Sequence, residues 1–117
     1  MPKLYHLSTC ATCRRILAEL NPPAAVECID IKPASVPAAD LDRMADLAGS
    51  YAALFSRRAR KYQTAGLAER TLGEADYRQL ILDEYTFLKR PVLLTDDAVY
   101  VGSAKATVAA ARQALHP

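Results

Sequence analysis

The sequence of 117 residues lacks several features that define whole classes of protein. No apolar run approaches the ~20 residues of a membrane-spanning helix, so we expect no membrane span. No charged segment followed by an apolar one opens the chain, so we expect no secretory signal peptide. Lysine plus arginine count 15 against 13 for aspartate plus glutamate, a net charge of +2. This balance predicts neither direct nucleic-acid binding nor binding to an acidic surface.

Cysteine is also scarce. The three cysteines are an odd number, which argues against the disulfide framework of a small secreted protein. Cys10, Cys13, Cys28 and His6 would be suitable zinc ligands, but a zinc ribbon needs a second closely spaced pair of Cys or His residues, which the sequence lacks. We therefore expect no metal site. We also expect a cytoplasmic location, where a C-x-x-C motif is more typically catalytic or metal-binding than structural.

The C-x-x-C motif itself is the most informative feature present. Cys10 and Cys13 follow a short apolar run and precede a helical pattern, the arrangement of a thioredoxin-like redox motif. At a helix N-terminus, unpaired backbone N–H groups favour the thiolate, and the basic Arg14 and Arg15 follow closely. We therefore expect Cys10 to be the nucleophile. Cys13, one helical turn on, can attack a disulfide formed at Cys10.

Apolar periodicity and turn residues predict an α/β fold. We expect strands at 3–7, 26–31, 91–95 and 98–101, and helices at 10–20, from 37 to about 48, from Glu74 through Tyr85, and at 105–115. The first strand, helix and strand form a parallel βαβ unit, and the last two strands form a hairpin. The stretch between the second and third strands is too long for a simple crossover. The prediction is one domain over 1–117, a four-stranded mixed sheet with a helical subdomain inserted at about 36–86.

Several segments resemble the arsenate reductase / Spx family over nearly the whole length. They are the thiol segment, the stretch 54–58, the spacing of Tyr62 to Gly66-Leu67, the strand entry 89–94 and the later Val101-Gly102. The resemblance implies a thioredoxin-like fold with a helical insertion and Cys10 as the nucleophile. It further implies that His6 lies behind this thiol and that Arg90 helps to bind an oxyanion. A cis peptide between Arg90 and Pro91, with Pro91 facing the thiol as a structural residue, is also implied.

The sequence departs from the arsenate-reducing pattern in the insertion. The arginine that those enzymes take from this region falls at Ser56, where Arg57 or Arg58 could substitute as binding residues. A third anion-binding arginine has no clear counterpart near Gly102. The run 56–58 looks more like the Spx-related branches.

Two functions therefore stay open. The favoured one is a cytosolic thiol-disulfide oxidoreductase of the arsenate reductase type, acting on a small oxyanion or thiol substrate. It would bind no cofactor, use glutathione or a thioredoxin or glutaredoxin as electron donor, and be a monomer. The alternative is an Spx-like regulator whose dithiol is a switch and whose partner is RNA polymerase, with 49–58 as a protein-binding face.

Some candidates also have purely structural interpretations. Cys13 lies on an apolar helical stripe and could be a buried core thiol, and His6 could be a histidine at the edge of the core. Cys28, in a strand, is more typical of a core residue than of a resolving thiol. Arg57 and Arg58, with the basic residues that follow them, could form a solvated helix face.

Overall fold

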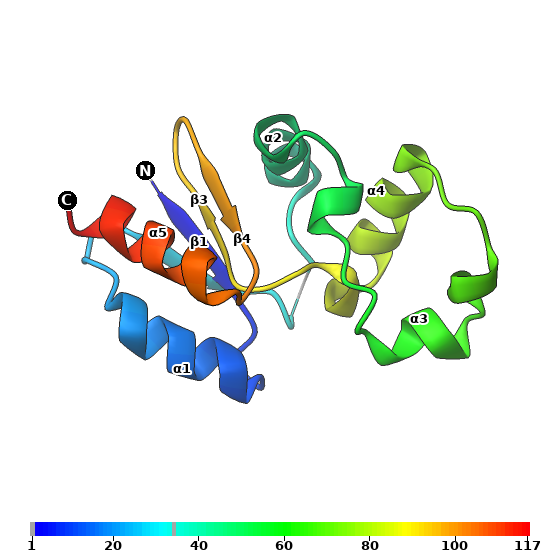
Figure 1. The fold of residues 1–117 in the computed structure, drawn as a ribbon, viewed down its shortest axis with the longest axis horizontal. Helices are drawn as coiled ribbons and strands as arrows, with labels where there is room; N and C mark the ends of the chain where they lie inside the picture. The colour runs from blue at the N-terminus through cyan, green and yellow to red at the C-terminus, as the bar shows by residue number, and fades with distance from the viewer. Residues whose placement is uncertain (1, 34) are drawn as a thin grey trace. The chain divides into compact units, whose positions relative to one another are not determined.

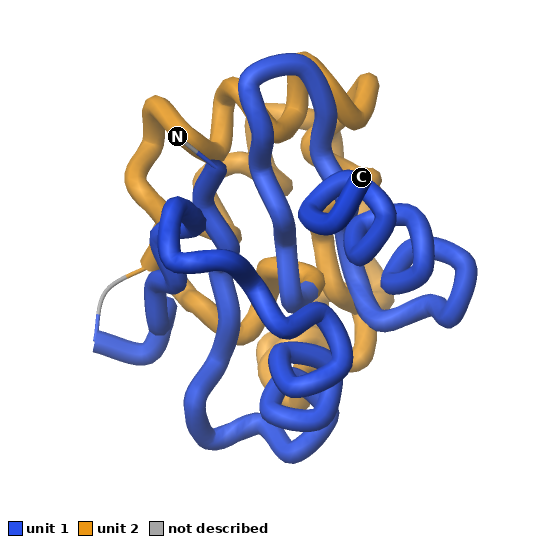
Figure 2. Tube along the Cα trace, turned by 90° about the vertical axis from the view of Figure 1, so that its left-hand side faces the viewer, with its two compact units in different colours: residues 1–33, 90–117 blue, residues 34–89 orange. Residues whose placement is uncertain are grey.

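The computed structural model describes residues 2–33 and 35–117. The chain forms two compact units, coloured separately in Figure 2. Residues 1–33 and 90–117 form one, which we call the sheet unit, and residues 34–89 form the other, which we call the helical unit. The chain therefore leaves the sheet unit after the second strand and returns to it just before the third.

The sheet unit contains a four-stranded mixed sheet, as the sequence predicts. Its strands are β1 (Lys3–His6), β2 (Glu27–Asp30), β3 (Val92–Leu94) and β4 (Val99–Val101). Their order is β2-β1-β3-β4, with β2 parallel to β1 and the other two pairings antiparallel (Figure 1). The parallel β1–β2 pair places the carboxyl ends of both strands at one edge of the sheet, where the chain continues toward the cysteine motif.

Helices α1 (Ala11–Leu20) and α5 (Lys105–Leu115) pack together in this unit (Figure 1). Their apolar faces share a core with the strands, made of Leu4, Ile16, Leu20, Val26, Leu93, Val108 and Ala111. Polar contacts join the ends of the two helices: Arg112 Nε donates to the Glu19 carbonyl at 3.1 Å, and a His116 ring nitrogen lies 2.8 Å from the Leu20 carbonyl. Burial of this core, at roughly 25 cal/mol per Å² of apolar surface, keeps α1 fixed against the sheet.

The helical unit contains three α-helices and three single 3₁₀ turns among the residues described. They are α2 (Ala38–Ala48), η1 (Ala52–Leu54), α3 (Arg60–Thr64), η2 (Leu67–Glu69), α4 (Glu74–Asp83) and η3 (Tyr85–Phe87). Its core is aromatic: the Phe55 ring lies 4.9 to 5.9 Å, centroid to centroid, from three other rings, those of Tyr62, Tyr77 and Phe87. Contacts between aromatic rings add to the stabilisation from burial alone.

Hydrogen bonds to carboxylates hold the segments of this unit together. Glu74, at the start of α4, accepts from the backbone N–H groups of Tyr51 and Ala52 at 2.6 and 3.1 Å. Asp42 on α2 accepts from the guanidinium of Arg78 at 2.8 and 3.2 Å and from the Tyr51 hydroxyl at 2.6 Å. These contacts join α2, η1 and α4 across long stretches of sequence.

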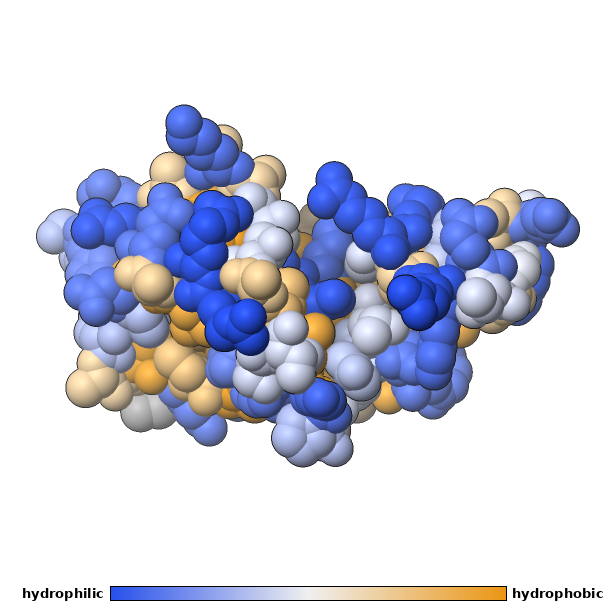
Figure 3. Space-filling view, turned by 90° about the horizontal axis from the view of Figure 1, so that it is seen from below, coloured by the Kyte–Doolittle hydropathy of each residue, from blue (hydrophilic) through white to orange (hydrophobic). Residues whose placement is uncertain are grey.

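Polar residues cover most of the face seen in Figure 3, with apolar residues in small areas among them. One large hydrophobic side chain among the described residues is substantially exposed, that of Leu47 at 38%. No helix within residues 2–33 and 35–117 has the length and apolar character to span a membrane.

Two local predictions were wrong. The helix expected to include Tyr85 ends at Asp83, and Tyr85 starts a separate 3₁₀ turn in which Glu84 accepts a hydrogen bond from the Thr86 N–H at 3.3 Å. This side-chain acceptor offers the backbone an alternative to a further helical turn. Cys28 was expected in the core, yet it is exposed. It lies on β2, an edge strand of the sheet, where side chains have a neighbouring strand on one side only.

Candidate active site

Cys10 occupies the N-cap position of α1. Its backbone is extended, with φ −93° and ψ 117°, and α1 begins at Ala11. The Cys10 N–H donates to the Leu7 carbonyl at 3.0 Å, and the Cys10 carbonyl accepts the N–H of Arg14 at 3.0 Å. The thiol is therefore placed where the first N–H groups of the helix have no intrahelical acceptor.

The environment of Cys10 favours its thiolate. Partial burial on its own raises the pKa of this thiol, but hydrogen bonds from the backbone and side chain of Cys13 and from the backbone of Thr12, with the positive charge of Arg90, outweigh it. The net effect is a pKa below the ordinary value for cysteine. The Cys10 side chain is only partly buried. An accessible thiol with a lowered pKa is the usual environment of a reactive cysteine.

Cys13 differs from Cys10 in both its exposure and its pKa. It is fully buried, at 0% exposure, on the apolar face of α1. Burial raises its pKa above the ordinary value; a hydrogen bond with the backbone of Leu7 opposes this, and the charge and side chain of Cys10 reinforce it. The sequence also allowed Cys13 to be a buried core thiol, and the structure shows that it is buried. Cys13 and Cys10 are nevertheless close enough for each thiol to act on the pKa of the other.

Arg90 and Pro91 lead into β3. The peptide bond between them is cis, which confirms the prediction made from the family resemblance. The positive charge of Arg90 favours the thiolate form of both Cys10 and Cys13, although burial keeps the pKa of Cys13 above its ordinary value. The Pro91 carbonyl accepts the Gly102 N–H at 2.9 Å.

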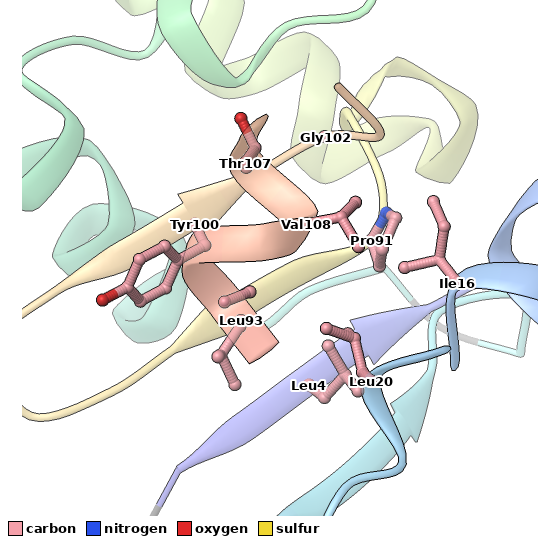
Figure 4. Close-up of a pocket in the computed structure, with 10 residues that line it drawn as sticks. Leu4, Ile16, Leu20, Pro91, Leu93, Tyr100, Gly102, Thr107 and Val108 are labelled. Carbon is pink, nitrogen blue, oxygen red and sulfur yellow. The ribbon is translucent and has the colours of Figure 1, made fainter. Parts of the chain in front are cut away.

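The ring of Pro91 lines a small apolar pocket in the sheet unit. Figure 4 shows it beside Ile16 of α1 and Val108 of α5. The pocket is lined almost entirely by core side chains, so it lacks the convergent polar groups of a typical ligand site.

His6 is the last residue of β1 and pairs in register with Asp30 at the end of β2. Its Nδ1 atom is buried and makes no hydrogen bond within the described residues. The charge of His6 is one of the factors that lower the pKa of Asp30, after hydrogen bonds from the Ser8 side chain and the Lys32 backbone. His6 thus lies at the same edge of the sheet as the turn that carries Cys10.

Arg57 and Arg58 lie in the helical unit. The Arg57 guanidinium donates to the Tyr77 hydroxyl at 3.1 Å and lies 5.9 Å from the centre of that ring. Hydrogen bonds to Tyr77 and Tyr62 raise its pKa above the usual value. Arg58 is exposed. Their part in anion binding stays a prediction.

One residue near the thiol was missed by the sequence reasoning. Asp30 accepts hydrogen bonds from the backbone N–H groups of Ser8, at 3.2 Å, and Lys32, at 3.1 Å. The available signal was an aspartate at the end of the second strand of a parallel pair, beside the turn that follows the first strand.

Among residues 2–33 and 35–117, no group of three or more His, Cys, Asp and Glu side chains could hold a metal ion.

Comparison with known proteins identifies the family. The model of the ArsC family matches residues 5–111. The chain belongs to the ArsC family. This confirms the resemblance seen in the sequence, and with it the thioredoxin-like fold of this ArsC-family chain. Family membership supports an oxidoreductase with a thiol-based redox function.

Solved structures agree with the fold of the ArsC-family chain. A protein called YffB is 26% identical, with a TM-score of 0.75, over 95% of this chain and 98% of its own. An arsenate reductase from Vibrio cholerae is 20% identical, with a TM-score of 0.77 over 93% and 95% of the two chains. An arsenate reductase related protein from Brucella melitensis is 23% identical, with a TM-score of 0.66 over 93% and 92%. No curated protein matches the chain.

Proposed function

We propose that this chain is a thiol oxidoreductase of the arsenate reductase type in which Cys10 is the nucleophile. The observation that carries the proposal is the contrast between the two thiols of the motif. Cys10 is accessible and has a lowered pKa, whereas Cys13 is buried and has a raised one. At neutral pH the thiolate therefore forms preferentially at Cys10, the sulfur that a substrate can reach.

With arsenate as substrate, the Cys10 thiolate attacks arsenic and an arsenate oxygen leaves as water, which forms a sulfur–arsenic bond. A second thiol then attacks the Cys10 sulfur. The sulfur–arsenic bond breaks, its electron pair stays on arsenic, and arsenite leaves. Arsenate and two thiols thus give arsenite, one disulfide and one water, with two electrons moving from sulfur to arsenic. Glutathione or Cys13 supplies the second thiol, and glutathione with a glutaredoxin or thioredoxin reduces the disulfide.

Positive charge near Cys10 supports an anionic substrate. The Arg90 charge lowers the pKa of Cys10, so the guanidinium is close enough to act on an anion bound there. Arginine presents a planar set of N–H donors that matches an oxyanion. In this proposal Arg90 binds the substrate oxygens, with His6 behind the thiol and Arg57 or Arg58 as further binding residues.

Arsenite formation from arsenate, with glutathione and glutaredoxin as reductants, tests the proposal directly. Cys10→Ser should abolish turnover because the attacking sulfur is removed. Cys28→Ser is the matched control and should leave turnover unchanged, since Cys28 lies on the exposed edge strand β2. Absence of arsenite formation by the wild-type chain would exclude arsenate as substrate.

A redox switch of the Spx type is the second candidate, because Cys10 and Cys13 act on each other's pKa and therefore lie close enough to work as one dithiol. A chain that lacks turnover but captures the RNA polymerase α subunit in a manner that depends on oxidation of this pair would be a regulator instead. The two assays therefore separate the enzyme from the regulator.

Mapping of the disulfide tests the role of Cys13. Oxidation should link Cys10 to Cys13, and mass spectrometry of the oxidised protein should show that linked peptide. A peptide linking Cys10 to Cys28 would move the resolving role to Cys28.

A further inference from the structure

We propose that Asp30 and Arg14 are positioning residues that fix the turn before Cys10 and so keep its thiol aligned with the N-terminus of α1. This inference rests on the proposed role of Cys10 as the nucleophile. Its basis is Ser8, whose peptide groups are held by two side chains. The Ser8 N–H donates to Asp30 Oδ1 at 3.2 Å, and the Ser8 carbonyl accepts from Arg14 Nη1 at 3.0 Å.

Asp30 connects the backbone segments that follow two neighbouring strands, β1 and β2. It pairs in register with His6 at the end of β1, and the Ile31 N–H continues the ladder to the His6 carbonyl at 2.9 Å. The same Oδ1 atom accepts the N–H groups of Ser8 and Lys32. One carboxylate therefore holds the backbone just after β1 to the backbone just after β2.

Arg14 holds the same turn from the helix. Its backbone N–H donates to the Cys10 carbonyl at 3.0 Å, while its guanidinium reaches back to the Ser8 carbonyl. The Cys10 N–H closes the turn by donating to the Leu7 carbonyl at 3.0 Å. Arg14 thus binds two carbonyls of the turn: its guanidinium donates to that of Ser8 and its backbone N–H to that of Cys10.

The turn needs such polar contacts because it has little apolar packing of its own. Leu7 is buried, but Ser8 and Thr9 are both exposed, so apolar packing does not restrain the backbone between Leu7 and Cys10. The pKa of Cys10 is lowered in part by the nearby backbone groups of Cys13 and Thr12 in the first turn of α1. A change in the turn moves the sulfur away from these donors, and the thiolate then loses stabilisation.

The sign of the effect distinguishes positioning from simple charge. Asp30 is negative, and its removal by charge alone lowers the pKa of Cys10 or leaves it unchanged. Loss of the anchored turn raises that pKa, because the thiolate loses hydrogen bonds. A rise in the Cys10 pKa after loss of Asp30 therefore has the sign expected from the lost contacts of the turn and the opposite sign to the direct effect of the lost charge.

The first test compares Asp30→Ala with Glu27→Ala. Glu27 is an exposed carboxylate at the other end of β2, so the control removes the same charge from the same strand. The Cys10 pKa is measured from the iodoacetamide rate of the Cys10 peptide against pH, followed by mass spectrometry. We expect Asp30→Ala to raise the pKa by about half a unit, which is about a threefold loss of thiolate at any pH well below the pKa. Glu27→Ala should not raise it.

Asp30→Asn keeps an oxygen acceptor for the Ser8 N–H without the charge, so its Cys10 pKa should be no higher than that of the wild type. This variant also gives a readout if Asp30→Ala folds poorly. A rise in the Asn variant equal to the rise in the Ala variant would contradict the proposed backbone anchor.

The second test compares Arg14→Ala with Arg15→Ala. Arg15 is exposed on the next residue of α1, so its variant shows the effect of losing one positive charge there. We expect the Cys10 pKa to rise more in Arg14→Ala. If wild-type Cys10 itself titrates like an ordinary thiol, the proposed function fails. If its pKa is low but neither Asp30→Ala nor Arg14→Ala raises it beyond the controls, only the positioning role is overturned.

Discussion

At the scale of single residues, the two cysteines of the motif differ in pKa because one is partly exposed to solvent and the other is buried in the core. Cys10 is at the first N–H groups of α1 and partly accessible, whereas Cys13 is three positions on and enclosed by the core. The same spacing that places one thiol at the helix end places the other on the apolar face. One turn of helix thus separates a partly accessible thiol from a buried one.

The first prediction concerns the relative reactivity of Cys10 and Cys28. Burial raises the pKa of Cys28, whereas hydrogen bonding lowers that of Cys10. A lowered pKa means that the thiolate persists to lower pH, so Cys10 should be alkylated faster at pH 7 although Cys28 is more exposed. Rates for the two peptides in one sample give the comparison, with Cys28 as internal control. Equal or faster alkylation of Cys28 would contradict the assignment of Cys10 as nucleophile.

The second prediction concerns Arg90. Arg90→Lys keeps the positive charge but loses the planar fork, so binding of an oxyanion should weaken by about tenfold or more while the Cys10 pKa changes little. KM for arsenate and the alkylation profile of Cys10 measure the two effects separately. The neighbouring exposed Lys89 provides the control, and Lys89→Ala should leave KM unchanged. Unchanged kinetics in Arg90→Lys would show that Arg90 has a structural role only.

At the scale of elements, helix ends are set by individual backbone conformations. Helix α2 ends at Gly49, which has φ 98° and donates its N–H to the Ala45 carbonyl at 2.8 Å. Only glycine adopts this left-handed conformation without a Cβ penalty, and the helix ends where the sequence predicts, at about residue 48.

The third prediction follows from this geometry. Gly49→Ala should lower the free energy of unfolding by about 1 kcal/mol, because alanine is strained at positive φ. Gly73→Ala is the matched control at another helix end. Gly73 has φ −97°, and a Cβ there meets only an Asp76 carboxylate oxygen at ordinary contact distance, 3.7 Å. Urea unfolding should show a smaller loss for Gly73→Ala, and equal losses would refute the conformational argument.

At the scale of the whole molecule, several carboxylates are ionised more readily in the folded chain than in model compounds. A hydrogen bond from Arg78 lowers the pKa of Asp42, one from Lys61 lowers that of Glu84, and one from Ser8 lowers that of Asp30. A folded-state pKa below the unfolded one stabilises the protein above the unfolded value, near ~4, and this stabilisation disappears as the pH falls through the folded value.

The fourth prediction is therefore a loss of stability on acidification. The urea midpoint should be nearly constant around neutral pH and fall below about pH 4. Asp42→Asn should lower the midpoint at pH 7 and reduce its change between pH 7 and pH 3, because this carboxylate no longer titrates. Asp46→Asn changes an exposed carboxylate on the same helix and serves as control. A pH dependence that is the same in all three proteins would show that the Asp42 contacts do not stabilise the fold.

The sequence by itself determined the order of elements and the position of the motif. Apolar periodicity, turn residues and the C-x-x-C spacing depend on neighbours within a few residues, so they can be recognised without knowledge of the fold. The resemblance added the cis bond before Pro91, which the structure contains.

Only the tertiary structure decided which thiol is accessible, that Cys28 lies on an exposed edge, and that Asp30 meets the turn before Cys10. Asp30 and Ser8 are distant in sequence and come together because β1 and β2 pair in parallel. Burial and long-range hydrogen bonds depend on which elements pack together, and no local pattern of residues contains that information.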